Sequence, residues 1–272
     1  MKRAERIRLQ AERERARDFS AHILPTCGEK HILPVPDDYD YLKRGFFRRL
    51  LAAFSVGVFR FVGLFVGPFC RFRVEGKRNL RNVKRAILTC NHVSIADCIL
   101  VRRAVGRKKL KITVAEFNNR RGVFGALLRA GGTVPIGKTL PALRRLNGAV
   151  REFLRLDYLV LFYPEGSLWW CYEKPRPLID GAFLSAARNG VPVVPMFFTF
   201  RPRGIRRDGT EKKAFTLHIG APIPPDPDLP LRDAAKRMSE LTWAFNRDTY
   251  ERVYGKKLEY EGDEGTKIRA LS

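Results

Sequence analysis

Short apolar runs that alternate with longer amphipathic stretches over the middle of the chain predict an α/β domain. The predicted strands are residues 86–90, 111–115, 133–136, 158–162, 191–200 and 214–219. Apolar residues also recur at steps of three and four, which predicts helices over 140–156, 181–189 and 231–254. We therefore expect one domain, in which a central mixed sheet is flanked by helices.

The most apolar stretch of the sequence, residues 46–70, precedes this domain. It is long enough to suggest a membrane-spanning helix. However, Arg60 lies near its middle, where a spanning helix would lose about 2.5 kcal/mol or more, and Gly67-Pro68 interrupts its end. We predict an apolar helix or helical pair that lies in the membrane interface, where Arg48 and Arg49 reach lipid headgroups. A full span and an ordinary core helix are the alternatives.

The first 40 residues are predicted to lie outside the packed domain. Residues 1–18 hold seven basic and four acidic side chains without an apolar stripe, which indicates a solvated helix or a frayed tail. Prolines over residues 24–38 predict an extended linker, after which the folded part should begin. The expected divisions are a tail and linker over 1–40, a membrane-associating segment over 41–75, a catalytic domain over 76–225, and a helix and tail of that domain over 226–272.

Charge and cysteine content narrow the setting. The chain has 52 Lys and Arg against 28 Asp and Glu, a net charge of +24 that favours a phosphate-rich partner, either anionic lipid or nucleic acid. Its five cysteines are widely spaced, with no pair or metal-like spacing, and the charged start has no apolar secretory signal. We expect a reduced protein at the cytoplasmic face of a membrane, with anionic lipids as partners and no metal.

Candidate chemistry follows the strand 86–90. His92 and Asp97 are five residues apart, so their side chains meet only if the chain turns from strand to helix between them. Ser94 is a suitable N-cap for a helix over 95–105. Asp97 would then fix the tautomer of His92, whose other nitrogen would accept a proton from an alcohol nucleophile. The structural alternative is that Ser94-x-x-Asp97 is only a capping box.

Four sequence blocks in order carry a family resemblance. His92 with four residues before Asp97 resembles the first signature of the glycerolipid (lysophosphatidate-type) acyltransferase family. Gly132-Thr-Val-Pro-Ile-Gly-Lys138 is similar to the second block, Tyr163-Pro-Glu-Gly-Ser167 to the third, and Val191-Pro-Val-Val-Pro195 to the fourth. Each block is short, but four in the family's order across residues 91–195 make a specific pattern.

The resemblance implies roles for single residues. His92 would be the general base and Asp97 its orienting partner, and Lys138 would contact a phosphate where the family usually has Arg. Leu168 stands where the family commonly has a phosphate-binding arginine, and Lys174 or Arg176 could supply that charge from a different angle. The substrate-binding residues implied are Asn91, Lys138, Pro164, Glu165, Gly166 and Ser167.

The function that the resemblance implies is transfer of a fatty acyl group to a lysophospholipid hydroxyl. Acyl-CoA or acyl-carrier protein would be the co-substrate, and no bound cofactor is required. One alternative is a nucleic-acid-binding protein. The net positive charge favours this alternative, but the sequence contains no recognisable nucleic-acid-binding module. Another is a lipid hydrolase or thioesterase, with Ser94 or Ser167 as nucleophile, although neither lies in Gly-x-Ser-x-Gly.

Overall fold

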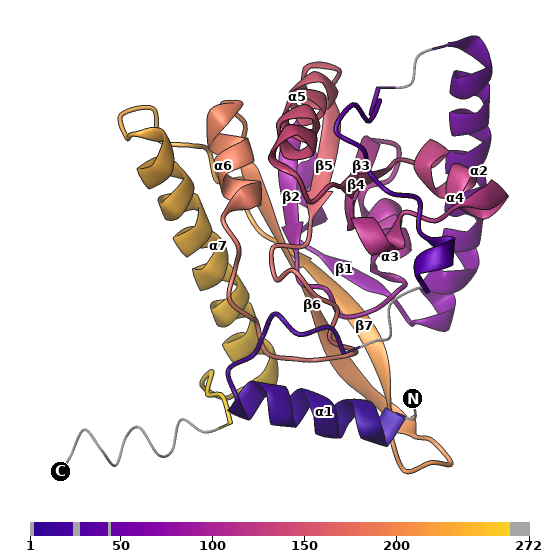
Figure 1. Ribbon diagram of the computed structural model, residues 1–272. Coiled ribbons are helices and arrows are strands. Elements are labelled where there is room, and N and C mark those ends of the chain that lie inside the picture. The colour runs from indigo at the N-terminus through magenta and orange to yellow at the C-terminus, as the bar shows by residue number, and fades with distance from the viewer. Residues whose placement is uncertain (1–2, 24–27, 43–44, 262–272) are drawn as a thin grey trace.

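A seven-stranded mixed sheet forms the centre of the molecule. The computed structural model describes residues 3–23, 28–42 and 45–261 (Figure 1). The strands lie in the order β1-β7-β6-β2-β5-β3-β4, and within this sheet β6 and β7 pair antiparallel while the other neighbours are parallel. Their bounds are β1 Arg73–Glu75, β2 Ala86–Cys90, β3 Lys109–Ala115, β4 Thr133–Ile136, β5 Tyr158–Phe162, β6 Val193–Ile205 and β7 Glu211–Ile219. The predicted fold class is confirmed.

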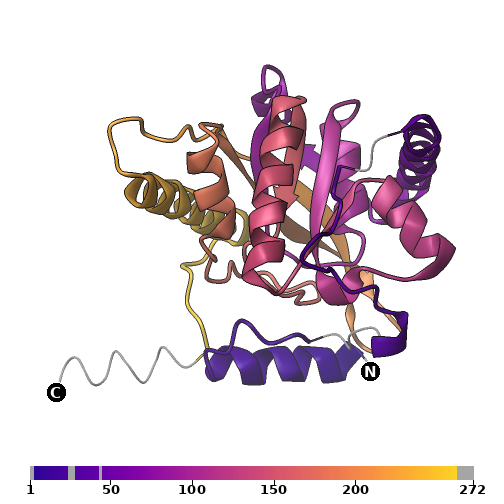
Figure 2. The same cartoon turned by 45° about the horizontal axis from the view of Figure 1, so that its top comes forward.

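Helices cover both faces of the sheet (Figure 2). On one face α3 packs into a core that also takes in Val66 and Cys70 from the end of α2, and on the other face α5, α6 and α7 enclose a second core. The α-helices are α1 Arg3–Arg15, α2 Phe46–Phe69, α3 Asp97–Val105, α4 Gly122–Ala130, α5 Leu140–Arg155, α6 Gly181–Arg188 and α7 Leu231–Tyr254. Short 3-10 turns lie at Glu29–His31, Lys77–Leu80 and Glu116–Asn118.

The register of the central strands brings two sequence blocks together. Thr89 of β2 is level with Phe162 of β5 on one side and with Pro195 of β6 on the other. The chain segments that leave β2 and β5 therefore emerge side by side at the carboxyl edge of the sheet. Ligand sites in open α/β sheets collect at this edge.

The α2 helix decides between two predicted alternatives. It is the single helix and not the helical pair, because Pro68 lies in its last turn, where the helix ends anyway at Phe69. Its buried positions are Ser55, Gly63 and Gly67, and the last two lie against Arg103 of α3.

The opposite face of α2 exposes Phe46, Phe47, Leu50, Phe54, Phe61, Leu64, Phe65 and Phe69. Within the described ranges it is the one helix long and apolar enough to cross a membrane. Its other side packs on the domain, and Arg60 turns back to the carbonyl of Gly106 at 3.4 Å. A helix that is held against the domain in this way and exposes a row of aromatic side chains is consistent with membrane association.

The N-terminal prediction is wrong for the residues that the structure describes. Residues 3–15 form α1, and this helix packs against the rest of the molecule instead of standing in solvent (Figure 1). Its buried Gln10 donates to the carbonyl of Trp170 at 3.2 Å, and its buried Glu14 pairs with Lys174. Ile23 is buried as well, so the folded part begins before the proline-rich segment, of which residues 24–27 lie outside the described ranges. Polar residues without an apolar stripe are buried here because each has a distant partner.

Candidate active site

His92 and Asp97 meet across the turn between β2 and α3. Nδ1 of His92 lies 2.9 Å from Oδ2 of Asp97, and the same oxygen accepts the backbone N–H groups of Val93 and Ser94 at 2.8 and 2.9 Å. An oxygen that accepts from two amides is an acceptor for the ring nitrogen too, so Nδ1 is the donor to Asp97, and in the neutral ring Nε2 is the nitrogen with the free lone pair. The predicted hydrogen bond is present.

The start of α3 differs from the prediction. The helix begins at Asp97 with Ala96 as its N-cap, not at residue 95 with Ser94 as the cap. The hydroxyl of Ser94 instead accepts from the N–H of Ala96 at 3.1 Å, inside the turn. Because the Asp97 carboxylate takes the amides of Val93 and Ser94, it holds the turn closed while it orients His92.

Asp97 is fully buried. Burial raises the pKa of its carboxyl group, and the hydrogen bonds from His92, Ser94 and Val93 lower it. Its other oxygen, Oδ1, has no hydrogen-bond partner among the described residues. A desolvated carboxylate of this kind gains most from a positive charge on its neighbour, which favours the moment when His92 becomes an imidazolium.

The His92 ring is held on one face and open at one edge. It stacks on Tyr163 with 4.1 Å between ring centroids, and its side chain retains 23% of its exposure. No hydrogen bond from Nε2 to a described residue is found. The ring therefore has a fixed plane, a fixed tautomer and a nitrogen available to a substrate.

Glu165 supports His92 from behind. Its Oε2 accepts the backbone N–H of His92 at 3.2 Å and pairs with the guanidinium of Arg176 at 2.7 Å. Its Oε1 accepts the backbone N–H of Arg176 at 3.0 Å, and both side chains of the ion pair are 1% exposed. Glu165 thus ties the segment after β5 to the backbone of the proposed base.

The structure places both Arg176 and Lys174, the candidate substitutes for the missing family arginine, in ion pairs. Arg176 is buried, and besides Glu165 it donates to the hydroxyl of Ser167 at 2.7 Å. Lys174 is paired with Glu14 of α1. Both cations are therefore already paired with carboxylates of the protein, Arg176 in the buried interior and Lys174 at a partly exposed position.

The segment after α1 completes the support, and nothing local in the sequence signals it. The carbonyl of Phe19 accepts from Ser167 and Arg176, both at 3.1 Å, and the carbonyl of Ala21 accepts from the indole of Trp169 at 2.9 Å. Trp169 in turn donates its backbone N–H to the carbonyl of His92 at 3.0 Å. Residues 19–21 therefore support Ser167, Arg176 and Trp169 from the outside, and Trp169 in turn contacts the backbone of His92.

The remaining predicted residues divide into buried and exposed groups. Asn91 is buried and bridges to β6, accepting from the N–H of Phe198 and donating to its carbonyl. Lys138 is exposed, pairs with Glu116 at 3.1 Å, and follows β4, three strands from β2.

Pro164 is buried and Gly166 is exposed, with a φ of 75° that suits glycine. Ser167 is buried in the Arg176 network, which occupies the hydroxyl that a hydrolase would need. Ser94 is likewise buried and engaged. Binding of substrate stays a prediction for all six residues assigned to it, Asn91, Lys138, Pro164, Glu165, Gly166 and Ser167.

Comparisons with known proteins bear on the domain and its fold. Residues 71–199 match the acyltransferase family, a span that contains every predicted site residue. The chain is similar in structure to the 1-acyl-sn-glycerophosphate (LPA) acyltransferase PlsC from Thermotoga maritima. The two share 17% identity over 80% of this chain and 87% of that chain, with a TM-score of 0.55. No curated protein matches. Residues 71–199 therefore match an acyltransferase domain, and the chain is similar in fold to a 1-acyl-sn-glycerophosphate acyltransferase.

Proposed function

We propose that this protein transfers a fatty acyl group from a thioester donor to a hydroxyl of a lysophosphatidate-like lipid, with His92 as general base. The observation that carries the proposal is the state of the His92 ring. Asp97 holds Nδ1 at 2.9 Å, and Nε2 is left without a partner among the described residues at a partly exposed edge. A base prepared in this way suits a hydroxyl that arrives with the substrate.

The reaction follows from this arrangement. Nε2 of His92 takes the proton of the acceptor hydroxyl while the oxygen attacks the thioester carbonyl, and Asp97 stabilises the imidazolium that forms. The tetrahedral intermediate then expels the thiolate, which receives the same proton from His92. An ester and a free thiol result, and no group on the protein becomes acylated.

Direct transfer is favoured over a covalent intermediate by the surroundings of His92. Ser94 and Ser167 are buried and hydrogen-bonded within the protein. Cys90 is buried too, and burial raises the pKa of its thiol well above the usual range. The chemistry needs no metal or bound cofactor, and acyl-CoA or acyl-carrier protein would serve as co-substrate.

The setting that we propose is the cytoplasmic face of an anionic membrane. The exposed apolar face of α2 supplies the insertion surface, and Arg48 and Arg49 at its first turns supply charge near the headgroups. The net charge of +24 adds attraction to anionic lipid. Positive charge would therefore attract the protein both to an anionic membrane and to an anionic lipid acceptor.

A donor and acceptor panel tests the proposal. Purified protein is incubated with isotope-labelled acyl-CoA or acyl-carrier protein and with lysophosphatidate, other lysophospholipids or monoacylglycerol, and the lipid products are identified by mass. We expect labelled diacyl phospholipid from at least one lysophospholipid. Release of free fatty acid with no acylated lipid would instead establish a hydrolase.

A further inference from the structure

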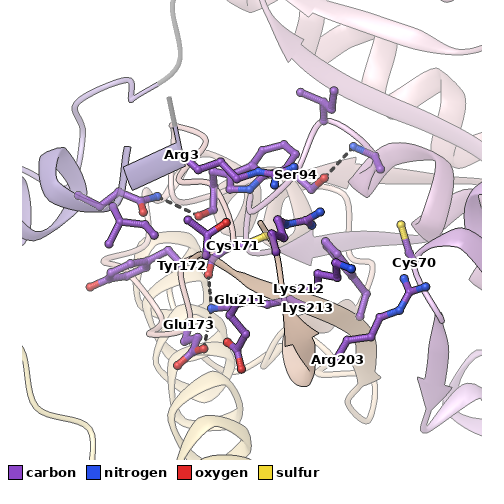
Figure 3. A pocket seen from close by; sticks show the side chains of 18 of the residues that line it. Arg3, Cys70, Ser94, Cys171, Tyr172, Glu173, Arg203, Glu211, Lys212 and Lys213 are labelled. Carbon is purple, nitrogen blue, oxygen red and sulfur yellow. Dashed lines mark hydrogen bonds and ion pairs between the residues drawn. The ribbon is translucent and has the colours of Figure 1, made fainter. Parts of the chain in front are cut away.

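A cavity of about 870 Å³ lies beside the His92–Asp97 turn, on the side of the β6–β7 hairpin (Figure 3). This volume is within the usual range for small-molecule sites. Its walls come from α1, the end of α2, the turn after β2, the segment 170–174 and the β6–β7 hairpin. None of the motif residues that the family resemblance singles out for substrate binding lines it.

The cavity has an apolar side. Ile7 of α1, Val66 and Phe69 of α2, and Phe215 of β7 contribute aliphatic and aromatic surface. Phe69 is 79% exposed and continues the row of apolar side chains along α2. A lipid chain that leaves the membrane along α2 therefore meets a continuous apolar path into the cavity.

The hairpin side carries three cations without a direct ion pair. Arg203, Arg206 and Lys212 line the cavity, and within the described part of the chain none of them lies in salt-bridge contact with a carboxylate. Glu211 shares the same wall, and Asp208 interacts with Arg206 through its charge. Arg203 donates only to the carbonyl of Phe69, at 2.6 Å, and Nε of Arg206 is buried without a hydrogen-bond partner. Other cavity cations are neutralised, as Lys213 is by Glu173 at 2.7 Å.

The cavity adjoins the turn that carries the proposed base, although neither His92 nor Asp97 itself lines it. Ser94, Ile95 and Ala96, which form the turn between His92 and Asp97, belong to its wall. Ile95 is 71% exposed at this point. A ligand with its chain against α2 and its anionic group on the hairpin would therefore lie against the turn that holds the proposed base.

We propose that this cavity is the acceptor site, in which Arg203, Arg206 and Lys212 bind the phosphate of a single-chain lipid. The assignment rests on the proposed acyl transfer to a lysophospholipid. It explains how the chain manages with Leu168 in place of an arginine and with Lys174 and Arg176 paired inside the protein. The phosphate is held by the hairpin, and the apolar tail lies between α1 and α2.

The test compares two acceptors that differ in the phosphate. Lysophosphatidate and monoacylglycerol with the same acyl chain are assayed with wild-type protein, Arg206→Gln and Lys212→Gln. Arg188→Gln is the control, because Arg188 is exposed on α6 and does not line the cavity. We expect Arg206→Gln to raise KM for lysophosphatidate about tenfold more than KM for monoacylglycerol, the effect of one lost charged hydrogen bond, with the larger change in KM rather than kcat. Arg188→Gln should leave the ratio of the two KM values, lysophosphatidate to monoacylglycerol, as it is in the wild type.

Direct binding separates this inference from the reaction. Full-length His92→Ala protein is titrated with lysophosphatidate, with and without Arg206→Gln. A tenfold weaker Kd with Arg206→Gln supports the site even if the wild type acylates nothing, which would overturn the proposed function alone. The proposed site is overturned if Arg206→Gln raises KM equally for both acceptors, or if it changes neither KM in an active enzyme. It is also overturned if coenzyme A displaces bound lysophosphatidate, since the cavity would then hold the donor.

Discussion

The buried pair of Glu165 and Arg176 offers the sharpest test of how the His92 segment is held. We consider Arg176→Met, which keeps an apolar stem of similar length but removes the guanidinium. Glu165 would be left as a desolvated carboxylate with its backbone donors only. Removing one partner of a buried ion pair destabilises a protein by about 3–5 kcal/mol. Both side chains here are 1% exposed, so little solvent is available to compensate.

The magnitude translates into a measurable melting shift. For a chain of this size 1 kcal/mol corresponds to about 2–4 °C, so Tm should fall by about 10 °C. The double variant Glu165→Gln/Arg176→Met has no unpaired charge and should recover most of the loss, with a coupling free energy above about 2 kcal/mol in a double-mutant cycle. Denaturant unfolding and calorimetry of the four proteins measure this. Additive effects, or a loss below about 1 kcal/mol for Arg176→Met, would refute the account of the pair.

Three further predictions address the dyad, the membrane face and the half-buried Lys111. Asp97→Asn should lower kcat by about 10²–10⁴-fold with a smaller change in KM, because the ring loses its tautomer control; unchanged kinetics would remove Asp97 from the mechanism. Phe47→Ser on the exposed face of α2 should weaken sedimentation with anionic vesicles, whereas Leu241→Ser on the exposed face of α7 should not; equal effects would locate the contact elsewhere. Burial, with a nearby arginine, lowers the pKa of Lys111 to about 8. The charged Lys111 therefore destabilises the folded state by at most about 3 kcal/mol. This cost is present in full below pH 8, where the lysine is charged in both the folded and unfolded states, and it disappears above about pH 10.5, where it is neutral in both. The stability gained by Lys111→Met should accordingly shrink as the pH rises from about 8 to about 10.5. A gain independent of pH would contradict this.

Much of the fold is predictable because its signals are local. The strands over 86–90, 133–136 and 158–162 and the helix over 231–254 have the predicted bounds, since apolar runs and helical spacing are written in adjacent residues. β1 was not predicted, because three residues with one partly buried side chain give no pattern. β6 and β7 extend beyond their predicted ends into an exposed hairpin, where pairing with each other replaces burial as the cause of strand structure.

The candidate site divides in the same way. The hydrogen bond between His92 and Asp97 follows from the strand-to-helix turn that their spacing requires. The role of Arg176 as a buried structural cation could not be predicted, because its partners Glu165, Ser167 and Phe19 meet only in the folded protein. α1 likewise has the composition of a solvated helix, and its buried polar residues are satisfied by partners more than 150 positions away.

The central claim is that His92 removes the proton from the acceptor hydroxyl, and one measurement tests it most directly. Transfer of a labelled acyl group to lysophosphatidate is followed by mass for the wild type and His92→Ala, with Tm measured on the same preparations. The account predicts acylated product from the wild type, a loss of at least about 10³-fold for His92→Ala, and a Tm within a few degrees of the wild type. Acyl transfer at the wild-type rate by a folded His92→Ala protein would contradict it.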